Sequence, residues 1–157
     1  MPRTIGTCLW FENQAEEAAQ FYTSVFDDSK ILNVSRFGEG APAPAGQAIA
    51  VVFELEGRGF TALNGAQGSN FTEAVSFVVD CENQDTVDRY WTALTDGGSE
   101  SMCGWLKDRF GVSWQIVPTV LDSLIAGPDP EGSQRAMQAM LGMRKLDIAE
   151  LQKAYDG

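Results

Sequence analysis

The sequence predicts an α+β fold made of two similar β-α-β-β-β modules and a helical tail. Two observations support this prediction. An apolar strand, a helix that ends near a Gly or Asp pair, and antiparallel strands follow one another twice, at a spacing of roughly 70 residues, which indicates an internal duplication. Beyond Pro118 the composition becomes helical. We therefore expect a single domain over residues 1–157, with its first module at 1–66, its second at 72–118 and the tail at 119–157.

The first module opens with a short apolar strand, which the turn-prone Glu12-Asn13 ends. Apolar residues then recur at helical spacing from Ala15 to Phe26. A loop with two prolines and three glycines separates the strands that follow. The predicted elements are a strand at 4–11, a helix at 15–26, strands at 30–37, 47–55 and 60–63, an exposed loop at 38–46 and a hairpin turn at 56–59.

The second module repeats this order. Val87, Tyr90, Trp91 and Leu94 share one helical face, and Gly97-Gly98 ends that helix. The predicted elements are a strand at 73–79, a helix at 86–94, strands at 101–106 and 112–117, and a solvated turn at 107–111 that includes Asp108.

The tail is predicted to form three helices, at 120–125, 133–143 and 146–155, with Pro130 at the start of the second. Its apolar stripe consists of Ala136, Met137, Met140, Leu141 and Met143. Methionines at helical spacing are typical of packing surfaces rather than of cofactor sites. We therefore interpret the tail as a helical cap that packs on a partner subunit, and we expect a homodimer.

Composition excludes several partners. Eleven basic and 22 acidic residues give a net charge of −11, which repels phosphate backbones and argues against nucleic acid. No segment approaches the roughly 18 apolar residues that would suggest a membrane span, so no membrane partner is expected. The N-terminus lacks the apolar region and cleavage site of a secretory signal, which favours a soluble, cytoplasmic protein.

The chain contains no histidine, so imidazole catalysis and a His-ligated metal are not expected. The three cysteines, Cys8, Cys81 and Cys103, lie far apart and lack CxxC spacing. That pattern disfavours a zinc site and a disulfide framework. Reduced, mostly buried thiols are the expected state.

Several segments resemble the vicinal oxygen chelate superfamily of glyoxalase and bleomycin-resistance proteins. Phe21-Tyr22 closes the first helix, and the final strand has the sequence Trp114-Gln115-Ile116-Val117-Pro118. Two further segments, 13–18 and 103–111, are similar to the PhnB-like branch, which often carries a demethylubiquinone methyltransferase label. The resemblance implies a curved, cup-shaped mixed sheet with metal ligands on the first and last strand of each module.

Those ligand positions fall on Thr7, near Ala62, near Ser76 and on Gln115. Such residues offer neutral oxygens or no donor, whereas transition metals need imidazole, thiolate or carboxylate ligands. We therefore expect no metal and no other cofactor. If Thr7 and Gln115 line the cup, strand alternation predicts that Trp10 and Trp114 face the covering helices, whereas a strand bulge would reverse this assignment. The predicted ligand contacts are Thr7, Leu9, Phe11, Ala62, Ser76, Cys103, Trp105 and Gln115.

Three functions are compatible with these residues. The leading hypothesis is that the cup binds a small apolar or aromatic molecule without a metal. The second is an enzyme of unassigned reaction that uses Cys103, beside Lys107 and Arg109, or Gln115. The third is a regulatory or structural dimer. Methyl transfer on a Rossmann-type fold is not supported, because the glycine pairs at 38–40 and 57–59 lie in a loop and a hairpin.

Overall fold

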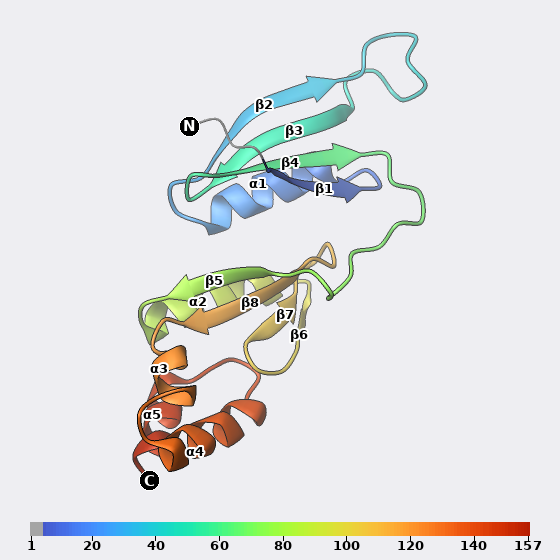
Figure 1. Cartoon of the computed structure of the whole chain (residues 1–157). Helices are drawn as coiled ribbons and strands as arrows, with labels where there is room; N and C mark the ends of the chain where they lie inside the picture. The colour runs from blue at the N-terminus through green and yellow to red at the C-terminus, as the bar shows by residue number, and fades with distance from the viewer. Residues whose placement is uncertain (1–4) are drawn as a thin grey trace. The chain divides into compact units, whose positions relative to one another are not determined.

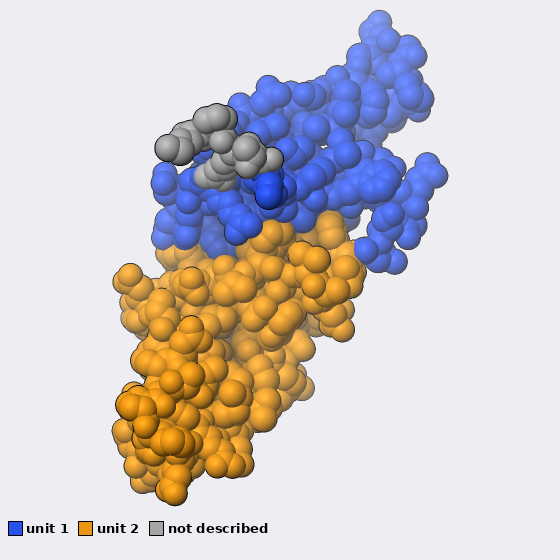
Figure 2. Space-filling view, viewed as in Figure 1, with its two compact units in different colours: residues 1–70 blue, residues 71–157 orange. Residues whose placement is uncertain are grey.

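The computed structural model describes residues 5–157 and divides into two compact units, Met1–Asn70 and Phe71–Gly157 (Figures 1 and 2). Each unit contains a four-stranded mixed sheet and a helix on one face of it, as the duplicated β-α-β-β-β order predicts. The α+β prediction is therefore confirmed. The first residue of the predicted opening strand, at position 4, lies outside the described residues.

Unit 1 consists of β1 (Thr7–Phe11), α1 (Ala15–Val25), β2 (Lys30–Arg36), β3 (Ala48–Leu55) and β4 (Arg58–Asn64). The strand order is β1-β4-β3-β2, with β1 parallel to β4 and the other pairs antiparallel. The turn between β3 and β4 has two residues with positive φ, Glu56 at 47° and Gly57 at 75°. Two left-handed residues suit the twist of a tight hairpin, so β4 begins already at Arg58.

Aromatic stacking defines the helix-facing side of this sheet. The ring of Tyr22, on α1, stacks on Phe53 with centroids 6.3 Å apart, and Phe53 stacks on Phe60 at 5.3 Å. Ala15, Ala18 and Ala19 keep the helix close to the strands, because their small side chains are fully buried. The core of unit 1 therefore lies between α1 and one face of the sheet.

Unit 2 contains β5 (Phe77–Cys81), α2 (Gln84–Thr95), β6 (Ser99–Glu100), β7 (Trp105–Lys107) and β8 (Ser113–Pro118) in the order β5-β8-β7-β6. Asn83 caps α2, since its Oδ1 accepts a hydrogen bond from the Thr86 amide at 2.9 Å. Val87, Tyr90, Trp91 and Leu94 are buried against the sheet, as their helical spacing predicts.

Two predicted strands of unit 2 were wrong in extent. Residues 73–75 form a turn and a bend, and β5 starts only at Phe77. The strand predicted at 101–106 is interrupted, because Cys103 and Gly104 have φ values of 59° and 82°. Left-handed backbone cannot continue a strand, so this segment turns and β7 begins at Trp105.

The tail forms α3 (Leu121–Ile125), α4 (Pro130–Leu141) and α5 (Ile148–Asp156), all within unit 2 (Figure 1). Its core is a cluster of Leu121, Leu124, Ala136, Leu146 and Leu151. Met140 and Met143 pack against this cluster, which accounts for part of the Met-rich stripe within the chain itself. No helix within residues 5–157 is long and apolar enough to cross a membrane.

Candidate functional site

Each sheet has a helix-facing side and an opposite side, which we call the open face. Registered partners on adjacent strands point to the same side of a sheet, so the strand register assigns every residue to a face.

The centre of the open face of unit 1 carries mostly small, uncharged side chains. Its two rows across the four strands are Cys8, Thr61, Val52 and Asn33, and Trp10, Leu63, Ala50 and Ser35. The Trp10 side chain is the largest of these, and 48% of its surface is exposed. The Trp10 ring therefore gives this open face an aromatic surface among small neutral side chains.

The predicted face of β1 was wrong. Thr7 is registered with Phe60, so Thr7, Leu9 and Phe11 lie on the helix-facing side, while Trp10 points to the open face. Ala62 is on the helix-facing side as well, and Leu9, Phe11 and Ala62 are buried in the core of unit 1.

The error is a shift of one residue in register. Cys8 and Thr61, each one residue away from Thr7 and Ala62, are registered with each other and lie on the open face. A shift of one residue moves a strand position to the other side of the sheet.

The open face of unit 2 brings together three of the predicted residues. Val78, Gln115 and Trp105 form one row across β5, β8 and β7. The Gln115 Nε2 donates a hydrogen bond to the Ser76 Oγ at 2.9 Å. Trp114 lies on the helix-facing side and is buried, as predicted. This face therefore combines an indole ring, an amide and a hydroxyl.

A pocket of about 330 Å³ adjoins this row. It is lined by Glu73, Ser101, Met102, Cys103 and Trp105. The Lys107 Nζ lies 3.7 Å from Glu73 Oε2, so an ion pair stands beside the pocket. The sequence already indicated Lys107 through its proximity to Cys103, whereas no sequence pattern indicates Glu73 or Met102.

The cations expected to activate Cys103 pair with carboxylates. Lys107 pairs with Glu73, and Arg109 Nη2 lies 3.0 Å from Asp96 Oδ2. Cys103 itself is half-buried. The other thiol near an open face is Cys8, and desolvation by burial raises its pKa. A thiol with a raised pKa is protonated at neutral pH and is therefore a weak nucleophile.

Asp108 is not solvated, contrary to the prediction. Only 3% of its surface is exposed. Its Oδ1 accepts hydrogen bonds from the amides of Phe110 and Val112 at 2.9 and 3.0 Å, and its Oδ2 accepts one from the Trp114 indole at 2.8 Å. The carboxylate thus shapes the turn from β7 to β8 and holds the Trp114 ring.

The donor set does not fit a transition metal. Ser76 and Gln115 supply only hydroxyl and amide oxygens, while Thr7 and Ala62 face the helix. Across residues 5–157, no three His, Cys, Asp or Glu side chains gather in a way that could hold a metal ion. No chemical step through a metal is derived for this chain.

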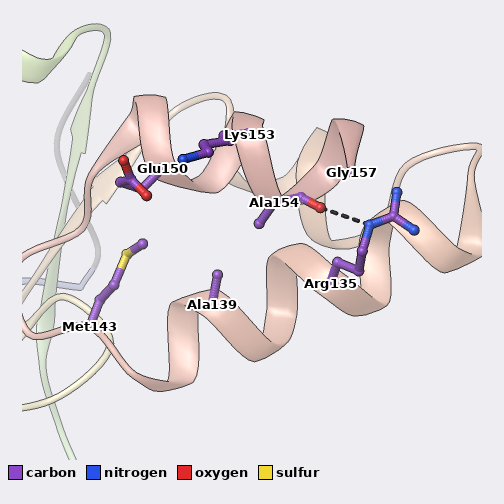
Figure 3. A pocket seen from close by; sticks show the side chains of 7 residues that line it. All are labelled: Arg135, Ala139, Met143, Glu150, Lys153, Ala154 and Gly157. Atoms are coloured by element: carbon purple, nitrogen blue, oxygen red, sulfur yellow. Dashed lines mark hydrogen bonds between the residues drawn. The ribbon is translucent and has the colours of Figure 1, made fainter.

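A second pocket, of about 360 Å³, lies between α4 and α5 (Figure 3). Arg135 of α4 donates hydrogen bonds from Nε to the Ala154 carbonyl at 2.9 Å and from Nη2 to the Tyr155 carbonyl at 2.6 Å. These contacts satisfy the free carbonyls at the end of α5. We interpret this pocket as part of the packing between the two tail helices.

Comparisons with solved structures identify relatives that share this fold. A PhnB protein from Bacillus cereus, which bears a 3-demethylubiquinone-9 3-methyltransferase label, is 36% identical; the match covers 74% of this chain and 100% of that one, with a TM-score of 0.70. A Pseudomonas aeruginosa protein is 20% identical over 74% of this chain and 98% of its own, with a TM-score of 0.62.

The fosfomycin resistance protein FosX from Mesorhizobium loti shares the fold, with a TM-score of 0.54, 10% identity, and coverage of 74% of this chain and 91% of that one. The chain thus has the glyoxalase-like fold that the sequence resemblance implied. A family model described as 3-demethylubiquinone-9 3-methyltransferase matches residues 3–117, and the chain belongs to this PhnB-like family. No curated protein matches it.

Proposed function

We propose that this chain binds a small apolar or aromatic molecule on the open faces of its sheets, without a transition metal. The observation that carries the proposal is the pocket lined by Trp105, whose registered partner on β8, Gln115, donates a hydrogen bond to the Ser76 hydroxyl. Ligand sites commonly combine apolar walls with a few polar groups that orient the ligand. An aromatic ligand would stack on the indole, and the amide would orient a polar substituent.

The predicted contact residues take two roles in this proposal. Ser76, Cys103, Trp105 and Gln115 contact the ligand on unit 2, and Trp10 offers a second aromatic surface on unit 1. Thr7, Leu9, Phe11 and Ala62 support the sheet of unit 1 from its helix-facing side.

The methyltransferase description does not carry over to a Rossmann-type mechanism. That mechanism requires a glycine-rich turn between a first strand and a helix in a parallel sheet. The turn from β1 to α1 is Glu12-Asn13-Gln14, and the sheet that contains β1 is mixed. Binding, rather than methyl transfer, is therefore the proposed function.

The test is a fluorescence titration of EDTA-treated, dialysed protein with N-phenyl-1-naphthylamine, a neutral aromatic probe. We expect saturable binding, and we expect Trp105→Ala to raise Kd about fivefold, which corresponds to the roughly 1 kcal/mol of an aromatic pair. Leu141→Ala is the control, because it removes a side chain that is 58% exposed on the tail. Binding that requires added metal, or an unchanged Kd in Trp105→Ala, contradicts the proposal.

We also propose that the protein is a homodimer. The open faces expose apolar side chains, such as Trp10 and Val78, which a second copy of the chain would bury. Light scattering after gel filtration should give about twice the chain mass of 17.1 kDa. A mass equal to one chain at micromolar concentration argues against the dimer.

A further inference from the structure

The turn at Cys103 and Gly104 forms one edge of the Trp105 pocket, and the C-terminal tail holds this turn. The Cys103 amide donates a hydrogen bond to the Met143 carbonyl at 2.8 Å, and the Gly104 amide donates one to the Arg144 carbonyl at 2.8 Å. Both turn residues have left-handed backbone. For Cys103 this conformation is unfavourable, so it persists only where surrounding contacts hold it.

Close packing fixes the turn from two sides. A Cβ at Gly104 would lie 2.8 Å from the Ile116 carbonyl oxygen of β8 and 3.1 Å from Leu146 Cδ1 of the tail. The Ile116 amide donates a hydrogen bond to the Gly104 carbonyl at 2.8 Å, and Leu146 is fully buried. The turn is therefore clamped between a strand of the family region and the segment that joins α4 to α5.

Gln84, the first residue of α2, fastens that segment. Its Nε2 donates a hydrogen bond to the Leu146 carbonyl at 3.0 Å, and its Oε1 accepts one from the Ile148 amide at 2.8 Å. At the surface, Lys145 Nζ lies 2.8 Å from Asp88 Oδ1. One glutamine side chain thus satisfies two backbone groups of the tail on either side of Asp147.

We infer that the tail is a positioning element for the ligand face, and that Gln84 is the residue through which it acts. The family match ends at residue 117, so the tail residues that hold the turn, Met143, Arg144 and Leu146, lie outside the matched region. By linkage, a ligand that favours the ordered turn also favours the docked tail. The effect of the tail on ligand affinity rests on the proposed function. The effect of the tail on the order of the turn at Cys103 and Gly104 does not depend on it.

The test compares Gln84→Ala with Gln152→Ala, which removes a glutamine that bonds only to Asp156 among the hydrogen bonds described for it. Amide hydrogen exchange at Cys103 and Gly104 is followed by NMR, with the amides of β3 in unit 1 as an internal reference. In Gln84→Ala we expect these two amides to exchange at least about tenfold faster, a factor equivalent to about 1.4 kcal/mol. We also expect Kd for N-phenyl-1-naphthylamine to rise about threefold or more, whereas Gln152→Ala changes neither quantity.

Three results overturn the inference: unchanged exchange at Cys103 and Gly104, equal acceleration at β3, or faster local exchange with an unchanged Kd. If the wild-type protein does not bind the probe, the proposed function fails, while the exchange rates still decide whether the tail orders the turn. Lys145→Ala removes the surface ion pair with Asp88 and leaves both Gln84 bonds to the tail in place, so it tests the same coupling with less risk to folding. It should accelerate exchange at Cys103 and Gly104 less than Gln84→Ala does, and the absence of any acceleration in both variants refutes the coupling.

Discussion

At the scale of single residues, Asp108 is a buried carboxylate in a segment whose composition is typical of an exposed turn. The segment Lys107-Asp108-Arg109-Phe110-Gly111 has the composition of an exposed turn. Its aspartate is nevertheless buried, because the Trp114 indole and two backbone amides supply three hydrogen bonds to the carboxylate. A buried carboxylate is tolerated when its lone pairs are satisfied in this way. Composition alone cannot reveal such partners.

Replacing Asp108 should therefore be costly. We expect Asp108→Ala to lower the free energy of unfolding by about 3 kcal/mol, because three N–H donors, two of them in buried hydrogen bonds, lose their acceptor. The matched control is Asp96→Ala, since the side chain of Asp96 is 78% exposed. Urea denaturation of both variants measures the difference. Equal losses in the two variants would show that the Asp108 contacts do not contribute to stability.

At the scale of elements, α1 is joined to β2 by an ion pair between Glu16 and Arg36. Arg36 Nη2 lies 2.6 Å from Glu16 Oε1, and Nη1 lies 2.9 Å from Oε2. This hydrogen bonding, together with the positive charge of Arg36, holds the pKa of Glu16 below its ordinary value. A depressed pKa in the folded state means that the pair stabilises the fold above the unfolded carboxyl pKa of about 4.3. The stabilisation is lost as pH falls through the lowered pKa.

The melting temperature should accordingly depend on pH through this pair. At pH 7 the melting temperature of the wild-type protein should be higher than that of Glu16→Gln. This difference in melting temperature should shrink as pH falls from 4.5 to 3.5. Glu17→Gln removes the same charge from the same helical turn but leaves the ion pair between Glu16 and Arg36 in place. Its melting temperature at pH 7 should therefore lie closer to that of the wild type than the melting temperature of Glu16→Gln does. A margin for Glu16→Gln that is independent of pH contradicts this assignment.

Most elements could be predicted from periodicity, and the errors have local causes. The helices α1 and α2 follow from the spacing of their buried residues. The strand at 101–106 was misjudged because its residues favour a strand, while contacts from the tail hold Cys103 in a left-handed conformation. Those contacts use the carbonyls of Met143 and Arg144, and backbone carbonyls have no signature in a sequence.

At the scale of the whole molecule, the internal duplication predicted the fold, but it did not determine the face on which each strand residue lies. The candidate residues Ser76 and Gln115 meet on unit 2, as the resemblance to the vicinal oxygen chelate superfamily implies. The positions predicted on unit 1, Thr7 and Ala62, lie on the helix-facing side, one residue out of register with Cys8 and Thr61 on the open face. The aromatic residue that reaches the open face there is Trp10 rather than Leu9 or Phe11.

The four tryptophans allow a direct test of binding on the open faces. Trp10 and Trp105 lie on open faces. The other two donate their indole N–H groups within unit 2, Trp91 to Glu100 Oε1 and Trp114 to Asp108 Oδ2, each at 2.8 Å. The indole N–H signals in an NMR spectrum therefore report separately on the open faces and on the hydrogen-bonded interior.

The decisive measurement is a titration of ¹⁵N-labelled protein with N-phenyl-1-naphthylamine in the presence of EDTA. We expect a saturable shift of the Trp105 indole signal, with or without a shift of the Trp10 signal, while the Trp91 and Trp114 signals stay in place. A shift confined to Trp91 and Trp114, or a Trp105 shift that appears only after a transition metal is added, would contradict it.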